Sequence, residues 1–226
     1  MLPNFSLFHG ARDDTIAVGN FGLGRAFTPI IEGLKNSTKS LHHIEVQNNR
    51  LDDRALADML AAVDHAHKEV VSLNLSGNQA GGATCKHLAN IISPFSSRLT
   101  DLNLSKMSIG DDELLTHSLG KGIAANFSIT KLDLSHNRLG NTRQRRSSNH
   151  TSVDDAAAAA APGSALAAAV AGNGRIIHLD LSWNAIRGPA AVLLANAMED
   201  NDALTELNLC MNKFGKTTWY LEYVVV

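Results

Sequence analysis

The sequence predicts an α/β solenoid, an open stack of coils with a parallel β-sheet on its concave face and helices on its convex face. Two observations lead to this prediction. A pattern of the form L-x-x-L-x-L-x-x-N-x-L recurs, with one exception, every 28 to 30 residues, and the copies are followed by apolar residues at helical spacing. The copies start at Asp13, Leu41, Val70, Leu99, Ile129, Ile176 and Leu204.

Each copy predicts one short strand followed by one helix. The template leucines alternate as in a strand, and after the second copy Leu56, Leu60 and Val63 lie on one helical stripe. Pro189 opens another apolar segment at a first-turn position, where its missing N–H costs little. Neither element can bury its apolar face alone, so stacking of the coils must supply the core.

The template and its period resemble the leucine-rich repeat. The strand-plus-helix unit resembles the ribonuclease-inhibitor subclass, which also occurs in NOD-like receptors and in the GTPase-activating protein of Ran. The resemblance covers residues 13–215 and implies a horseshoe-shaped leucine-rich-repeat solenoid, without implying a reaction. We expect an N-terminal segment at residues 1–12 and a single domain of about seven repeats at residues 13–226.

The interval of 47 residues between Ile129 and Ile176 indicates an insertion, which we place at residues 141–163. Its first half is polar and charged, so it has little to bury and is expected to be disordered. The arginines before Ser147 resemble the context of a phosphorylation site, and "RQRR" resembles a proprotein-cleavage motif. An unstructured surface loop is the preferred interpretation.

Composition narrows the class of protein. The chain has 226 residues, is 44% hydrophobic and carries a net charge of −2, so no basic excess favours nucleic acid. Cys85 and Cys210 lie several repeats apart, which predicts free thiols. Without a signal-peptide or membrane-spanning pattern, we expect a cytoplasmic protein that binds no membrane.

The apolar "TTWYLEYVVV" at residues 217–226 suggests a covering partner, self-association, a larger complex or a truncated gene product.

Trp183 suggests a site for a protein partner. Equivalent residues of adjacent coils stack in columns about 4.8 Å apart, and Trp183 falls between His136 and Met211 in such a column, where other copies carry Asn, Gly or Lys. We predict that these three side chains anchor a partner at the concave face or its rim. The alternative is that Trp183 packs over the loop of its own repeat.

Neighbouring columns add charge to this predicted site. Asp133, Asp180 and Glu206 form an acidic flank beside His178, which favours a partner with a basic segment. The partner-binding prediction therefore comprises Trp183, Met211, His136, Asp133, Asp180, His178 and Glu206.

Catalytic and metal chemistry are not expected. His178, Asp180 and Ser182 resemble a triad in sequence, but same-face neighbours along a strand lie about 7 Å apart. His65 and His67 point in different directions on a predicted helix. We therefore predict no catalytic residue, no metal and no cofactor.

The sequence thus predicts a non-catalytic protein-interaction scaffold, with two alternatives. The first is a Ran-type GTPase-activating protein, since Arg50, Arg138 and Arg187 follow the template asparagine of their copies, where the activating loop of that family begins. None of these three arginines lies in a longer loop of the kind that carries the activating arginine in that family. The second alternative is a structural subunit of a larger assembly, such as a ciliary or flagellar complex.

Overall fold

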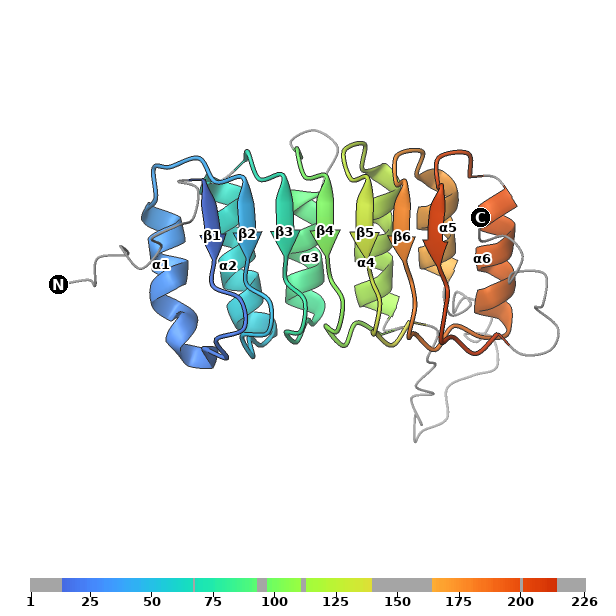
Figure 1. Ribbon diagram of the computed structural model, residues 1–226, viewed down its shortest axis with the longest axis horizontal. Helices are drawn as coiled ribbons and strands as arrows, with labels where there is room; N and C mark the ends of the chain where they lie inside the picture. Colours follow the sequence, from blue (N-terminus) through green and yellow to red (C-terminus); the bar gives the residue numbers. More distant parts are fainter. Residues whose placement is uncertain are drawn as a thin grey trace, which may run out of the picture.

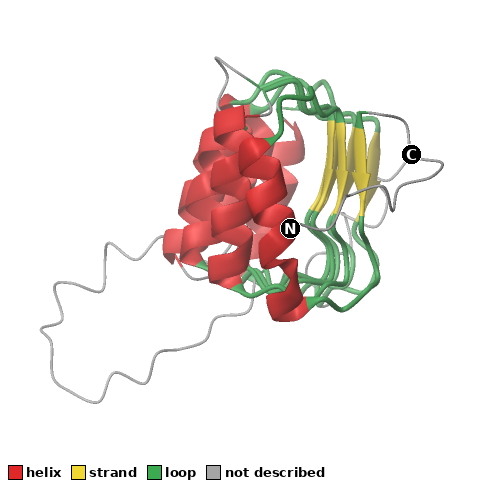
Figure 2. Ribbon diagram, turned by 90° about the vertical axis from the view of Figure 1, so that its left-hand side faces the viewer, coloured by secondary structure: helices red, strands yellow, loops and turns green. Residues whose placement is uncertain are grey.

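The computed structural model describes residues 14–214, except for residues 67, 93–96, 111–112, 140–163 and 200. Strands form one layer and helices the other, and loops join the layers at both edges (Figures 1 and 2). The predicted insertion with Ser147, the N-terminal segment, His67 and the apolar C-terminal segment lie outside the described residues.

Seven strands form a single open parallel sheet in chain order, which confirms the predicted fold class (Figure 1). The strands are β1 (Thr15–Ala17), β2 (His43–Glu45), β3 (Ser72–Asn74), β4 (Asp101–Asn103), β5 (Lys131–Asp133), β6 (His178–Asp180) and β7 (Glu206–Asn208). The helices are the 3-10 helix η1 (Gly24–Phe27) and α1 (Thr28–Asn36), α2 (Asp53–Ala66), α3 (Gly82–Ile91), α4 (Glu113–Ala125), α5 (Ser164–Gly172) and α6 (Pro189–Glu199).

The register of the sheet follows the predicted columns. The middle residue of each strand points toward the helices, and Leu132 pairs with Leu102 on one side and Leu179 on the other. The first and third residues of the strands point away from the helices, and we call the surface they form the strand face. β5 pairs directly with β6 although 47 residues separate them, so the longer interval leaves the strand order unbroken.

The core lies between the two layers and runs through all the coils. On α2, the predicted stripe of Leu56, Leu60 and Val63 is buried, and Leu73 and Leu75 meet it from the coil of β3. Burying one such side chain contributes about 2 kcal/mol. Because adjacent helices pack in chain order, each coil completes the core of its neighbours.

Asparagines after the strands connect each coil to the one before it. Asn137 donates from Nδ2 to the carbonyl oxygens of Leu104 (2.8 Å) and Leu134 (3.0 Å). Its Oδ1 accepts the backbone N–H groups of Met107 and Ile109, both at 3.0 Å. Equivalent bonds form at Asn49, Asn78, Asn184 and Asn212. We call these five residues, which are the template asparagines of their copies, the asparagine ladder.

Met107 occupies the template asparagine position of its copy and interrupts the ladder. Its side chain is fully buried in the core. The N–H of Ala80, which an asparagine Oδ1 would accept, donates instead to the carbonyl oxygen of Met107 at 3.0 Å. A backbone acceptor therefore takes over one hydrogen bond of the missing amide.

A second set of asparagines, which the sequence analysis missed, lies at the opposite edge. Asn126, Asn173 and Asn201 donate to carbonyl oxygens near the end of the helix in the preceding coil, as in the 2.7 Å bond from Asn173 to Ile123. Their Oδ1 atoms accept N–H groups just before the next strand. They satisfy carbonyls that a helix end leaves without a partner. The recurrence of Asn three residues before the first template leucine was the available signal.

Asp53 joins two coils on the helix side. Its carboxylate accepts the N–H groups of Gly81 (2.8 Å), Ala83 (3.3 Å) and Thr84 (2.8 Å) at the start of α3, and also the Thr84 hydroxyl (2.6 Å). Burial alone would raise the pKa of Asp53. The hydrogen bonds from Thr84, Ala83 and Gly81 outweigh burial and lower the pKa below its ordinary value.

We expect Asn137→Ala to lower the free energy of unfolding by about 3 kcal/mol, since it removes the partners of four backbone groups. Urea unfolding followed by circular dichroism measures the change. Met107→Leu conserves side-chain volume at the gap in the ladder, so it should lower the free energy of unfolding by less than about 1.5 kcal/mol. An Asn137→Ala variant as stable as the wild type would show that the ladder is dispensable.

We expect Asp53→Ala to destabilise the protein by about 1 kcal/mol at neutral pH. Because the folded pKa is lowered, the contribution is complete above the unfolded pKa of about 3.9 and is lost as the pH falls through the folded pKa. Urea unfolding of both proteins between about pH 7 and pH 3 should show the difference shrinking in acid. Asp58→Ala, at an exposed site on the same helix, is the control; a difference independent of pH would contradict this account.

Candidate partner-binding surface

The turn after each strand contains one residue in the left-handed backbone region. Its φ lies between +53° and +69° in all seven coils. The residues are Asn20, Asn48, Gly77, Lys106, His136, Trp183 and Met211. Six of them are exposed and Gly77 is partly so, which means that the side chain at this position does not belong to the core.

This turn geometry explains the variable column that contains Trp183. The left-handed conformation costs an ordinary residue about 1 kcal/mol, and Gly or Asn adopts it most easily. Asn20, Asn48 and Gly77 fit that preference, whereas Trp183 does not. The sequence analysis did not identify the left-handed turn, although the Asn and Gly residues of the column were a signal for it.

Trp183 stacks on the preceding coil. Its ring lies nearly parallel to that of His136, with an interplanar angle of 8° and 5.2 Å between ring centroids. The N–H of His136 donates to Ser182 O and that of Trp183 to Cys210 O, both at 2.9 Å, so the backbone fixes the two turns relative to each other. The predicted alternative, in which Trp183 packs over the loop of its own repeat, does not describe this contact.

The stack stays open to solvent. Trp183 is 52% exposed, and Met211 in the next turn is 63% exposed. Aromatic pairs of this kind contribute about 0.5–1.5 kcal/mol. The structure thus places His136, Trp183 and Met211 in three successive turns at the rim of the strand face.

Asp133 and Asp180 build turns as well as carrying charge. Their Oδ1 atoms accept the N–H groups of Ser135 (2.9 Å) and Ser182 (2.8 Å), and Asp180 Oδ2 accepts the side-chain amide of Asn208 (2.9 Å). Asn74 and Asn103 make the same turn contact in earlier coils. Both carboxylates are half-buried, a structural role that the sequence analysis did not assign.

His178 and Glu206 lie side by side on β6 and β7. His178 Nδ1 contacts Glu206 Oε2, and both side chains are exposed. His178 therefore pairs across the sheet, while Ser182 is buried and its N–H donates to Asp180. The hydrogen bonds of a Ser-His-Asp triad are not formed by this set.

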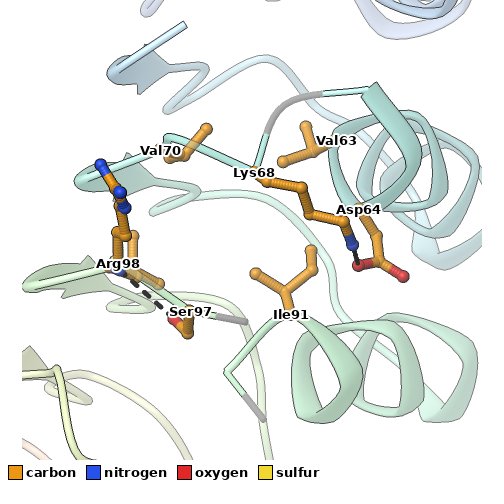
Figure 3. Close-up of a pocket in the computed structure, with 8 residues that line it drawn as sticks. Val63, Asp64, Lys68, Val70, Ile91, Ser97 and Arg98 are labelled. Atoms are coloured by element: carbon orange, nitrogen blue, oxygen red, sulfur yellow. Dashed lines mark hydrogen bonds and ion pairs between the residues drawn. The ribbon is translucent and has the colours of Figure 1, made fainter. Parts of the chain in front are cut away.

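The described residues offer no metal site, and the one pocket that they alone are seen to line is too small for a ligand. No group of three or more His, Cys, Asp and Glu side chains among them is placed to hold a metal ion. A shallow pocket between α2, α3 and the segments before β3 and β4 has a volume of about 20 Å³ (Figure 3). The ion pair of Lys68 with Asp64 lies at its wall. It has room for about one water molecule, far below the several hundred Å³ of a ligand pocket.

None of the helices in the described segments is long and apolar enough to span a membrane.

The two cysteines are free and differ in environment. Burial, together with the negative charge of Asp53, raises the pKa of Cys85 to about 12, whereas Cys210 is exposed in the turn before Met211.

Comparison with protein families matches two segments of the chain, residues 125–142 and 176–195, to the Leucine Rich repeat. These segments contain the turns of His136 and Trp183. The match to these two segments agrees with the leucine-rich-repeat type of solenoid that the open parallel sheet and the strand-plus-helix coils form.

A search of curated proteins gave no significant match. Among solved structures, the actin-binding site 2 of leiomodin-1 is similar at 14% sequence identity and a TM-score of 0.37. The match covers 83% of this chain and 80% of that one. A resemblance this distant does not extend to function.

We expect one thiol per chain to react with Ellman's reagent at about pH 8 in the native protein, because buried Cys85 stays protonated. The second thiol should react only in denaturant. Cys210→Ser should abolish the native reaction. Two reactive thiols in the native protein would contradict the buried environment of Cys85.

Proposed function

We propose that this protein is a non-catalytic interaction scaffold that binds a protein partner at the rim of the strand face, in the coils of β5, β6 and β7. The observation that carries the proposal is the exposed stack of Trp183 on His136 beside Met211. An exposed aromatic and a methionine at positions that the fold does not need to fill have the composition of an interface core.

The stack also favours affinity. A partner that covers Trp183 gains burial of a large apolar ring, and tryptophan is among the residues that most often dominate interface energetics. The ring is already held by His136 and the turn hydrogen bonds, so little side-chain freedom is lost on binding. This arrangement supports Trp183 as the central contact.

The acidic flank suggests the chemistry of the partner. Asp133, Asp180 and Glu206 lie on the three strands that precede these turns, and Glu206 is exposed beside His178. A partner with a basic segment would associate faster with this flank, an effect that salt would screen. Asp180 also holds its turn through hydrogen bonds and Glu206 contacts His178, so these two carboxylates have partners within the chain as well.

Other features agree with narrower parts of the proposal. Helices in successive coils with a 28- to 30-residue spacing favour the ribonuclease-inhibitor-like subclass. Free thiols at Cys85 and Cys210 favour a reducing compartment such as the cytoplasm. Arg50 and Arg138 sit in short turns directly after ladder asparagines, so no observation favours the GTPase-activating alternative. Nothing specific favours the structural-subunit alternative either.

The test is affinity purification from native lysate with the wild-type chain and Trp183→Ala, after urea unfolding has shown both to be folded. We expect at least one partner to be retained by the wild type and depleted about 30-fold with Trp183→Ala, the loss typical of an interface hot spot. Loss of the stack in Trp183→Ala should lower the free energy of unfolding by no more than about 1.5 kcal/mol.

Phe127→Ala is the matched control, because Phe127 is also an exposed aromatic, at the opposite edge before β5. This variant should keep the same partners as the wild type. If Trp183→Ala also keeps every partner at the wild-type level, Trp183 is not an interface anchor and the proposal is wrong.

A further inference from the structure

A row of unpaired cations follows the turns after the strands. We define the turn edge as the left-handed residue of each turn together with the residue two positions later. Its charged members are Arg50, Lys106, Arg138 and Lys213. All four are exposed, and none forms an ion pair within the described part of the chain. The turn edge, all of which is described, contains no carboxylate.

The adjacent strand face has the opposite sign. Among its residues on β2 to β7, the carboxylates are Glu45, Asp101, Asp133, Asp180 and Glu206. The only ammonium group among those positions is Lys131. Two strips of opposite charge therefore run side by side across the coils, one on the strands and one on the turns that follow them.

The stack belongs to the turn edge and lies where that edge borders the strand face. His136 is three residues after Asp133 and two residues before Arg138, and Trp183 is three residues after Asp180. Successive coils are about 4.8 Å apart, within the screening length of about 8 Å at physiological salt, so like charges on neighbouring coils reinforce one another. This applies to the carboxylates of β4 to β7 and, on the turn edge, to Lys106 and Arg138. A partner centred on Trp183 would meet both signs of charge.

We infer that the partner is a protein surface that presents basic side chains to the strand face and acidic side chains to the turn edge. This inference rests on the proposed function and adds the orientation of the partner. Reversing the partner would place like charges opposite each other on both strips, which is costly. A nucleic acid would satisfy the turn edge but would bring phosphates close to the carboxylates of the strand face, so a protein of mixed charge fits better.

The charge arrangement can be tested without knowing the partner. The probes are hexaglutamate and hexalysine peptides, titrated separately into isotope-labelled full-length protein at about 50 mM salt, where electrostatic contacts are weakly screened. Amide chemical shifts locate each probe. Hexaglutamate should shift the amides of Lys106, Arg138 and Lys213, and hexalysine those of Asp133, Asp180 and Glu206. The inference is overturned if hexaglutamate does not localise to the turn edge or if both peptides shift the same residues.

A charge-reversed variant sharpens the test. Lys106→Glu combined with Arg138→Glu should weaken hexaglutamate binding by about ten-fold or more and leave hexalysine binding at least as strong. Lys121→Glu, at an exposed position on α4, is the control and should change neither. A twelve-residue oligothymidylate that bound the turn edge more tightly than hexaglutamate at about 150 mM salt would identify a nucleic-acid surface instead.

The outcomes separate this inference from the proposed function. If Trp183→Ala retains every partner while the peptides localise as expected, the charged strips exist but the Trp183 anchor is wrong. If a partner depends on Trp183 but binds the Lys106→Glu, Arg138→Glu variant with unchanged affinity, the orientation inference alone is wrong.

Discussion

Every structural feature of this protein depends on satisfying the backbone polar groups where a strand leaves the sheet. Each coil turns sharply there, and the turn would bury N–H and carbonyl groups without partners. The ladder amides of Asn78, Asn137 and Asn184 supply those partners from the following coil. The same bonds set the register between coils, so core formation and backbone satisfaction occur together. At Met107, where the amide is missing, a backbone carbonyl accepts the Ala80 N–H.

The ladder also separates the residues that fold the protein from those that are free to bind. The residue before each ladder asparagine lies in the left-handed region with its side chain outside the core, and Asn20 and Lys106 share this conformation in turns without a ladder asparagine. That position tolerates Asn48, Lys106 and Trp183 alike. The strand face is less free, since Asp133 and Asp180 also hold turns through their carboxylates. Binding chemistry therefore concentrates at the turns, where sequence can vary at little cost to stability.

Much of the fold was predictable because the same pattern of strand, turn and helix recurs in successive copies of the repeat. Leucine spacing predicted the parallel strands and the helix faces that form the core. The position of Trp183 beside His136 and Met211 followed from the columns, whereas its nearly parallel stacking on His136 depends on a left-handed φ that alternation does not reveal. The turn-forming role of Asp180 and the second asparagine set were missed because each depends on contacts between loops of adjacent coils.

Site-specific photo-crosslinking in native lysate tests the central claim most directly. A photoreactive phenylalanine derivative would replace Met211, next to Trp183, or Phe127, at the opposite edge. If a partner covers the turns after β6 and β7, position 211 should give a discrete adduct that position 127 does not. No adduct from position 211, or the same adduct from both positions, would contradict the assignment of the binding surface to these turns.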